Sequence, residues 1–151
     1  MAAFETDILA DLIRAKQTCL TQVRDMGRRQ LELIQSGDMT TLLDLLAAKQ
    51  RVIVQLQRIE RALDPFRGQD PRQRRWRSPQ DRQACAEQIQ QCEALLQEII
   101  SQEKQSEGAL IRRRDEAALR LQGVHLAGQA RGAYTAPPQG TVRQLDLLSE
   151  S

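Results

Sequence analysis

Hydrophobic side chains recur at alternating spacings of three and four along residues 38–66. The positions on this seam are Leu42, Leu45, Lys49, Val52, Leu56, Ile59, Leu63 and Phe66. Such a heptad pattern keeps one face of a helix turned toward a partner helix. Leu43, Leu46 and Ile53 widen the apolar face, as expected for a helix that contacts two neighbours. We therefore expect a helix over about 38–64 at the centre of the fold.

The ends of this helix are marked by residues with special backbone preferences. Gly37 suits the left-handed conformation that closes a preceding helix, and Asp38 can cap the start of the next one. Pro65 disfavours helical geometry in the residue before it, so we expect the helix to end there. Lys49 is the one charge on the seam. We expect its aliphatic stem to pack while its ammonium group reaches water or a carboxylate.

A second seam predicts a helix over about 5–35. It consists of Ile8, Leu12, Ala15, Cys19, Val23 and Met26, reinforced by Leu9, Leu20, Leu31 and Ile34. Thr6 or Asp7 can cap its start, and acidic residues near this end suit the positive end of the helix dipole. Because the connection to the next helix is so short, we expect the two helices to lie antiparallel as a hairpin.

A third amphipathic segment starts at Ser78-Pro79, a serine cap followed by proline at the first helical position, and predicts a helix over about 79–128. Its seam consists of Cys85, Ile89, Cys92, Leu96 and Ile99, helped by Leu95 and Ile100. The pattern then weakens, and it resumes in Leu110, Ala117, Leu121 and Val124. At 1.5 Å per residue this helix is roughly 75 Å long, which exceeds the other two. We therefore expect its distal half either to fray or to bind a partner.

The fold class that follows is all-α: an antiparallel helical hairpin plus a long third helix, in a three-helix bundle or coiled coil. We expect one all-helical domain over 1–130 and a flexible C-terminal tail over 131–151, because the tail contains a proline pair and no helical period. Charged residues make up 28% of the chain and aromatic residues 3%, a composition that favours long amphipathic helices.

The sequence carries no pattern typical of an enzyme, such as a glycine-rich phosphate loop, a GxSxG motif or an HExxH motif. His125 is the only histidine, and Cys19, Cys85 and Cys92 form no CxxC pair, so a zinc site of the usual kind is excluded. We expect no catalytic residue, cofactor or metal, and we expect the cysteines to be small buried hydrophobic side chains in a reducing cytosol. No apolar run approaches the roughly 20 residues that cross a membrane, so we expect no membrane insertion.

An arginine-rich loop over 67–78 surrounds the only tryptophan, Trp76. The arginines, Arg72, Arg74, Arg75 and Arg77, could neutralise phosphates while Trp76 stacks on a base. This is one short loop, however, without a basic helix or a recognised nucleic-acid-binding module. We therefore do not expect a nucleic-acid partner. We expect Trp76 to cover the end of the helical bundle and the arginines to stay solvated.

The order of these features resembles the FlgN-like flagellar export chaperones. In that family the second helix of a hairpin opens with Gly-Asp and a leucine pattern, followed by a lysine and alternating aliphatic residues. The matching positions are Gly37-Asp38, Leu42, Leu45, Lys49, Val52, Leu56 and Ile59. Two later segments also match: Glu107-Gly108-Ala109-Leu110-Ile111, where Glu107 stands for the usual asparagine, and Ala133-Tyr134. The resemblance covers most of residues 5–135.

This resemblance implies a cytoplasmic, ATP-independent chaperone of type III flagellar export. Such chaperones bind hook-associated proteins of the hook–filament junction (FlgK and FlgL types) through a C-terminal amphipathic helix, prevent their premature assembly and deliver them to the export gate. The client-binding residues would be Leu110, Ala117, Leu121, Val124 and Leu126, which would cover a client helix. The matching tyrosine, Tyr134, would contact the export gate.

Two other classes of function stay open. The chain could be a structural or scaffolding coiled-coil protein that homo-oligomerises, with its distal apolar residues pairing with a second copy. It could also be a helical protein that associates with nucleic acid through the arginine-rich loop. The export chaperone would be a monomer or weak dimer in isolation and would form a one-to-one complex with a hook-associated protein.

Overall fold

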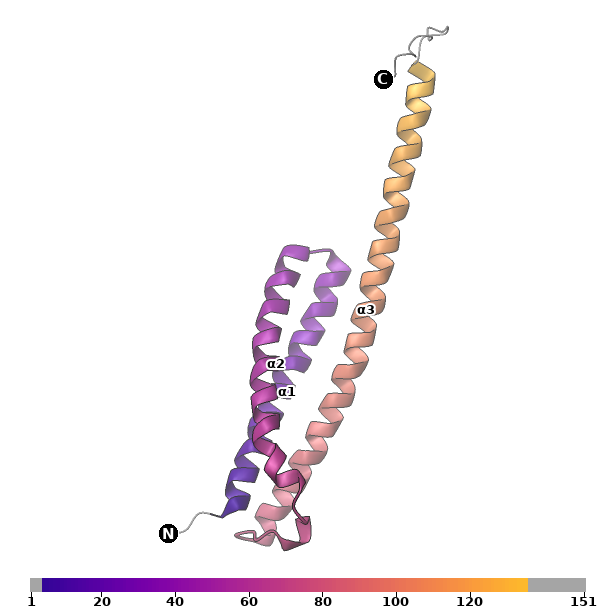
Figure 1. The fold of residues 1–151 in the computed structure, drawn as a ribbon. Helices are drawn as coiled ribbons and strands as arrows, with labels where there is room; N and C mark the ends of the chain where they lie inside the picture. The colour runs from indigo at the N-terminus through magenta and orange to yellow at the C-terminus, as the bar shows by residue number, and fades with distance from the viewer. Residues whose placement is uncertain (1–3, 136–151) are drawn as a thin grey trace. The chain divides into compact units, whose positions relative to one another are not determined.

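The computed structural model of the chain describes residues 4–135, with side chains up to residue 133. This described part is all-α: α1 covers Glu5–Ser36, α2 Met39–Arg67, the short 3-10 helix η1 Pro71–Gln73, and α3 Pro79–Thr135 (Figure 1). The expected hairpin with a long third helix is confirmed. The chain divides into two compact units, Met1–Leu110 and Ile111–Ser151, with the boundary inside α3. The domain over 1–130 stays a prediction.

A tight turn joins α1 to α2, and the two helices lie side by side in opposite directions (Figure 1). Gly37 adopts a left-handed conformation with φ 81° and ψ 12°, and its N–H donates to the carbonyl of Leu33 at 3.0 Å. The carboxylate of Asp38 accepts from the backbone N–H of Thr41 at 3.1 Å and from its hydroxyl at 2.7 Å. Both signals predicted at this turn are therefore confirmed.

The end of α2 differs from the prediction, because the helix continues through Pro65 to Arg67 instead of ending at Asp64. Proline removes one backbone hydrogen bond from the last turn. Two nearby interactions offset this loss. The ring of Phe66 is buried in the core, and the Arg67 guanidinium donates to the Glu60 carbonyl at 3.0 Å.

The end of α3 also differs, since the helix reaches Thr135 instead of ending near residue 128. Gly128 and Gly132 each cost about 1 kcal/mol relative to alanine, and the good helix former Ala130 lies between them. Residues 131–135 of the expected flexible tail are therefore helical. The remainder of that tail, residues 136–151, lies outside the described residues.

The core of the first unit contains residues from all three helices. It consists of Leu9, Ile13, Cys19, Leu20, Val23, Ile59, Leu63, Phe66, Cys85, Cys92, Leu95 and Ile99. A second cluster, near the turn between α1 and α2, consists of Leu33, Ile34, Leu42 and Ala109. At Gly27, an added side chain would meet the end of the Gln102 side chain, which would have to move. That amide donates to the carbonyl of Arg24 at 3.0 Å.

The predicted seam of α2 is confirmed, because all eight of its positions are buried or half-buried. Leu43, which was expected to widen the apolar face, is instead 68% exposed. On α1 the deepest positions include Leu9 and Ile13, while Ile8 of the predicted seam is 53% exposed. Adjacent apolar residues at 8–9 and 12–13 fit a helical seam in two registers. Packing against the other helices buries Leu9 and Ile13, the later residue of each pair.

On α3 the predicted seam is confirmed at Cys85, Cys92 and Ile99, which are buried, but not at Ile89 and Leu96, which are exposed. Leu95, expected only to reinforce this seam, is buried instead. The three cysteines are free and buried, as expected for small hydrophobic side chains. Burial raises the pKa of each of these thiols above its ordinary value.

Candidate functional site

The side chains of α3 beyond Leu110 are almost all exposed. Among the described residues 111–133, Arg113 and Ala117 are half-buried and the others are exposed. The largest exposed apolar side chains, given with their exposed fractions, are Leu119 (67%), Leu121 (71%), Val124 (66%) and Leu126 (56%). Large apolar side chains gathered on one exposed helix are typical of an interaction surface. This segment is therefore the first candidate functional site.

Most of the predicted client-binding residues share one face of α3. An α-helix turns by about 100° per residue, so a spacing of seven, four or three returns a side chain to nearly the same face. The residues that meet this condition, which we call the distal stripe, are Leu110, Ala117, Leu121 and Val124. Leu126 lies on roughly the opposite face together with Leu119. The helix therefore does not bring Leu126 together with the other four predicted residues.

The distal stripe is in helical register with the buried face of α3. Cys92, Ile99 and Ser106 follow one another at intervals of seven, and all three are buried in the first unit. Leu110 is already 41% exposed. The heptad pattern thus continues along α3 after its burial within the chain has ended. Such a pattern favours contact with a helix from another molecule.

Tyr134 lies in α3, near its end at Thr135. Its side chain lies outside the described residues. Its expected contact with an export gate therefore stays a prediction.

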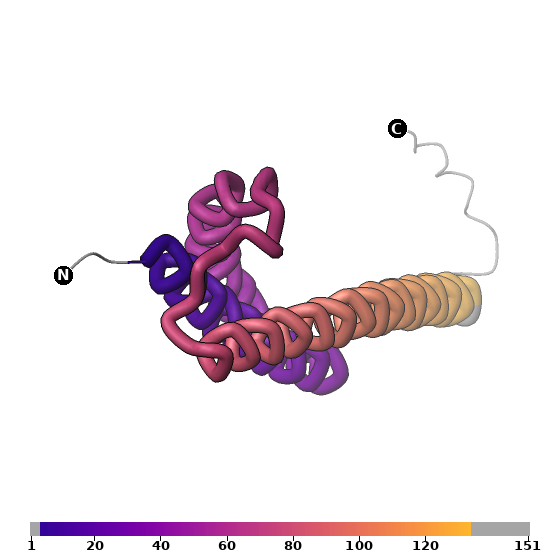
Figure 2. The backbone as a smooth tube through the Cα atoms, turned by 90° about the horizontal axis from the view of Figure 1, so that it is seen from below, coloured from indigo at the N-terminus to yellow at the C-terminus, as the bar shows by residue number. Residues whose placement is uncertain are grey.

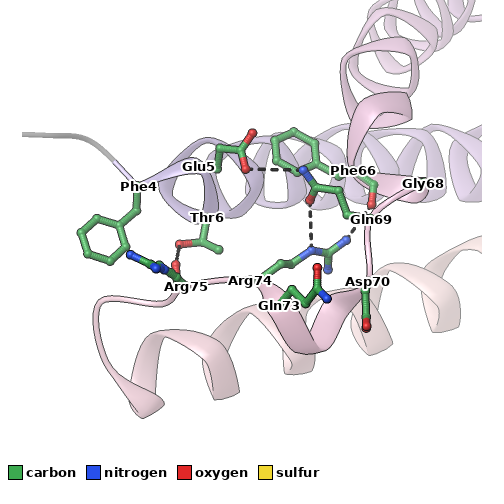
Figure 3. A pocket seen from close by; sticks show the side chains of 10 residues that line it. All are labelled: Phe4, Glu5, Thr6, Phe66, Gly68, Gln69, Asp70, Gln73, Arg74 and Arg75. Carbon is green, nitrogen blue, oxygen red and sulfur yellow. Dashed lines mark hydrogen bonds between the residues drawn. The ribbon is translucent and has the colours of Figure 1, made fainter.

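The arginine-rich loop is anchored to the start of α1. It crosses this end of the helix on its way from α2 to α3 (Figure 2). The hydroxyl of Thr6 donates to the carbonyl of Arg75 at 2.6 Å, and the Arg74 guanidinium donates to the carbonyl of Phe66 at 2.7 Å (Figure 3). These residues line a cavity of about 670 Å³ with mixed acidic, basic and aromatic walls.

Arg77 forms a further anchor of the loop. Its Nε donates to both carboxylate oxygens of Asp7, at 3.0 and 2.9 Å, and its Nη2 lies 2.8 Å from Asp7 Oδ2. Its guanidinium also lies over the ring of Phe4, 4.8 Å from the ring centre. The hydrogen bonds from Arg77 lower the pKa of Asp7 below its ordinary value. Asp7 also accepts from the backbone N–H of Phe4 at 3.3 Å. Phe4 is the N-cap of α1, so the predicted cap at Thr6 or Asp7 is wrong; both residues lie in the first turn of the helix.

These contacts change the interpretation of the loop. Trp76 is half-buried against the core, as expected. Arg74 and Arg77 are not merely solvated, contrary to expectation, because both bind groups of the protein itself. Their donors hold the loop in place, and this leaves fewer of them for phosphate groups. The structure thus supplies no support for the nucleic-acid alternative.

The other residues considered for chemistry are exposed or dispersed. His125 lies on the surface, where its Nε2 is 3.2 Å from the side-chain nitrogen of Gln129. Within residues 4–135, no group of three or more histidine, cysteine, aspartate or glutamate side chains is placed to hold a metal ion. No helix in the same range combines the length and the apolar character that spanning a membrane requires.

A groove between α2 and α3 is a feature that the sequence analysis missed. It has a volume of about 400 Å³, and it lies entirely within the first unit. Its floor is formed by Leu20 and Val23 of α1. Its apolar walls are Leu46, Ile53, Leu56, Leu96 and Ile99. The sequence pattern does not predict that Leu43 and Ile100 are exposed, because their exposure depends on how the helices pack.

Comparison of the chain with protein-family models, with curated proteins and with solved structures found no match.

Proposed function

We propose that this protein is an export chaperone of the FlgN-like kind. The distal stripe binds an amphipathic helix of a hook–filament junction protein, keeps it from assembling prematurely and carries it to the export gate. The observation that carries this proposal is the exposure of Leu121 and Val124 on a heptad pattern whose earlier members are buried. The sequence resemblance supplies the class of client and the cytoplasmic location.

The physical basis of capture is the burial of apolar surface. Full burial of a leucine or valine side chain contributes about 1.5–3 kcal/mol. The distal stripe offers Leu110, Leu121 and Val124 for this purpose, and all three are exposed before binding. A client helix with residues at matching heptad positions would cover them. Binding of this kind needs no nucleotide, and it can be reversed at the export gate.

The test is a binding titration with a purified hook–filament junction protein, followed by fluorescence anisotropy. Leu121→Glu should weaken binding about tenfold or more, because it places a charge in the apolar contact. Leu119→Glu is the matched control. It introduces the same charge two residues away, on the opposite face and at similar exposure, and should change the affinity less than about twofold. Equal effects of the two substitutions, or no binding by the wild-type chain, would contradict the proposal.

A further inference from the structure

We propose that the distal stripe selects a client helix that carries acidic residues along both sides of its own apolar seam. The inference rests on the proposed function for its site, and it adds the chemistry of the partner. The residues that carry it lie between 111 and 133, so all of them belong to the second unit of the chain.

The exposed segment of α3 is basic. Residues 111–135 contain five arginines, no lysine, one aspartate and one glutamate, a net charge of +3 with His125 neutral. Residues 79–110 of the same helix contain six acidic residues and two basic ones, a net charge of −4. The positive charge is therefore a property of the exposed segment and not of α3 as a whole.

The arginines of this segment lie mostly beside the apolar stripe. At about 100° per residue, four of the five lie within about 70° of the axis that runs through Ala117, Leu121 and Val124. The flanking positions are Arg113, Arg120 and Arg131 on one side and Arg114 on the other. The stripe is thus bordered by positive charge on both sides.

Both acidic residues lie away from the stripe. By the same rotation, Glu116 is about 110° and Asp115 about 150° from its axis. Arg114 pairs with Asp115 at 3.2 Å, but these side chains are 74% and 62% exposed. An ion pair that water solvates this well contributes little, so Arg114 can exchange Asp115 for a carboxylate on a partner.

A helix with carboxylates on both sides of its apolar seam complements this surface. Its seam would cover Leu121 and Val124, while its carboxylates would meet the flanking arginines. The planar guanidinium of arginine can donate to both oxygens of one carboxylate. A helix with basic flanks would place like charges together, which disfavours binding. The charges beside the stripe therefore select among amphipathic helices.

Other polyanions match the segment less well. A helix that lies on a membrane buries one broad apolar face. Leu119 and Leu126 are exposed roughly opposite the stripe, so the large apolar side chains do not gather on a single face. A nucleic acid would bind the arginines through its phosphates, and this would leave Leu121 and Val124 uncovered.

The first test compares two synthetic peptides with the same leucine heptad seam. One peptide has glutamate at every position that flanks the seam, and the other has lysine there. Neither pairs with itself, because like charges repel across the seam. In fluorescence anisotropy at low salt, the full chain should bind the glutamate peptide about tenfold or more tightly than the lysine peptide. Equal affinities, or no binding of either peptide, would overturn the inference.

Two charge reversals locate the contact. Arg120→Glu should weaken binding of the glutamate peptide about fivefold or more, because Arg120 flanks the stripe. Arg112→Glu is the matched control: it makes the same change of charge on the same helix, about 150° from the axis of the stripe, and should change the affinity less than about twofold. Equal losses would show that only the net charge of the chain matters, and would overturn the inference.

Anionic phosphatidylglycerol vesicles provide a further comparison. Binding to these vesicles that Arg120→Glu abolishes, without a preference between the two peptides, would assign the segment to a lipid surface and overturn the inference.

The proposed function and this inference fail in different ways. A junction protein that binds through Leu121, together with equal affinities for the two peptides, would leave the proposed function standing and contradict the selection by charge. A preference for the glutamate peptide without binding of the junction protein would support the selection by charge and contradict the proposed function.

Discussion

Lys49 places a cation among the packed faces of three helices. Its side chain is only 7% exposed, and its ammonium donates to Gln30 Oε1 of α1 at 2.9 Å. It also forms an ion pair with Glu103 of α3, whose side chain is 49% exposed. The expectation that the stem packs while the ammonium reaches a carboxylate is confirmed. An isolated charge at this depth would be strongly unfavourable, so the pair holds α2 and α3 in one register.

Glu103→Ala should lower the free energy of unfolding by about 1–2 kcal/mol. Removing one partner of a fully buried pair costs about 3–5 kcal/mol, and the half-exposed position of Glu103 reduces that figure. Urea denaturation monitored by circular dichroism measures the loss. Glu107→Ala, one turn further along the exposed surface, is the matched control and should cost less than about 0.5 kcal/mol. Equal losses would show that the pair with Lys49 contributes nothing specific.

From the lowered pKa of Asp7 we predict that the free energy of unfolding depends on pH in the acid range. Arg77 lowers its pKa, so the folded state binds this proton more weakly than the unfolded chain, where an aspartate has a pKa of about 3.9. The contribution to stability is therefore present above about pH 3.9, and it is lost as the pH falls through the folded-state pKa. In Asp7→Asn the free energy of unfolding should decrease less steeply over this acid range.

Urea denaturation at a series of acid pH values measures this slope. Arg77→Gln should flatten the slope as Asp7→Asn does, because it removes the donor that lowers the pKa of Asp7. The double variant should add nothing further, since the two residues act as one pair. A slope for Asp7→Asn equal to that of the wild type would show that the pair does not persist in solution.

At the scale of single elements, local signals predicted the helix starts better than the helix ends. The hydroxyl of Ser78 accepts from the N–H of Asp81 at 3.1 Å, so the expected cap of α3 is confirmed. The end of α2 is different, because the effect of Pro65 competes with the burial of Phe66 in a distant core. A cap depends on residues three positions apart, whereas that burial depends on helices far along the chain.

The distal stripe shows the same difference between what local spacing predicts and what only the packing of the helices decides. Its heptad spacing is a property of α3 alone, and it predicted Leu121 and Val124 as neighbours on one face. The spacing also excludes Leu126, which lies on roughly the opposite face of the helix. The exposure of these residues depends on where the other helices end, and this required the tertiary structure.

At the scale of the whole molecule, the division after Leu110 predicts that the first unit folds alone. Deleting residues 111–151 removes no member of either core cluster, because Ala109, the last of them, is retained. The truncated chain should keep its cooperative thermal transition, with the midpoint lowered by less than about 5 °C. Circular dichroism measures the transition. A cut before Ala109 would remove its contacts with Leu33 and Leu42 and serves as the destabilised comparison.

The same truncation separates folding from binding. It should abolish client capture, because it removes Leu121 and Val124. A truncated chain that no longer unfolds cooperatively would contradict the independence of the first unit. Retained client affinity would contradict the assignment of the distal stripe.

By itself, the sequence determined the all-α class, the hairpin turn at Gly37-Asp38 and the start of a third helix longer than the other two, because helical period, caps and turn residues act over a few positions. The tertiary structure decided which of two adjacent apolar registers on α1 is buried, as at Ile8 and Leu9. It also decided that Arg77 holds Asp7 and that a groove opens between α2 and α3. Those outcomes depend on side chains about 70 positions apart in sequence, as Asp7 and Arg77 are, and no local pattern encodes which of them meet.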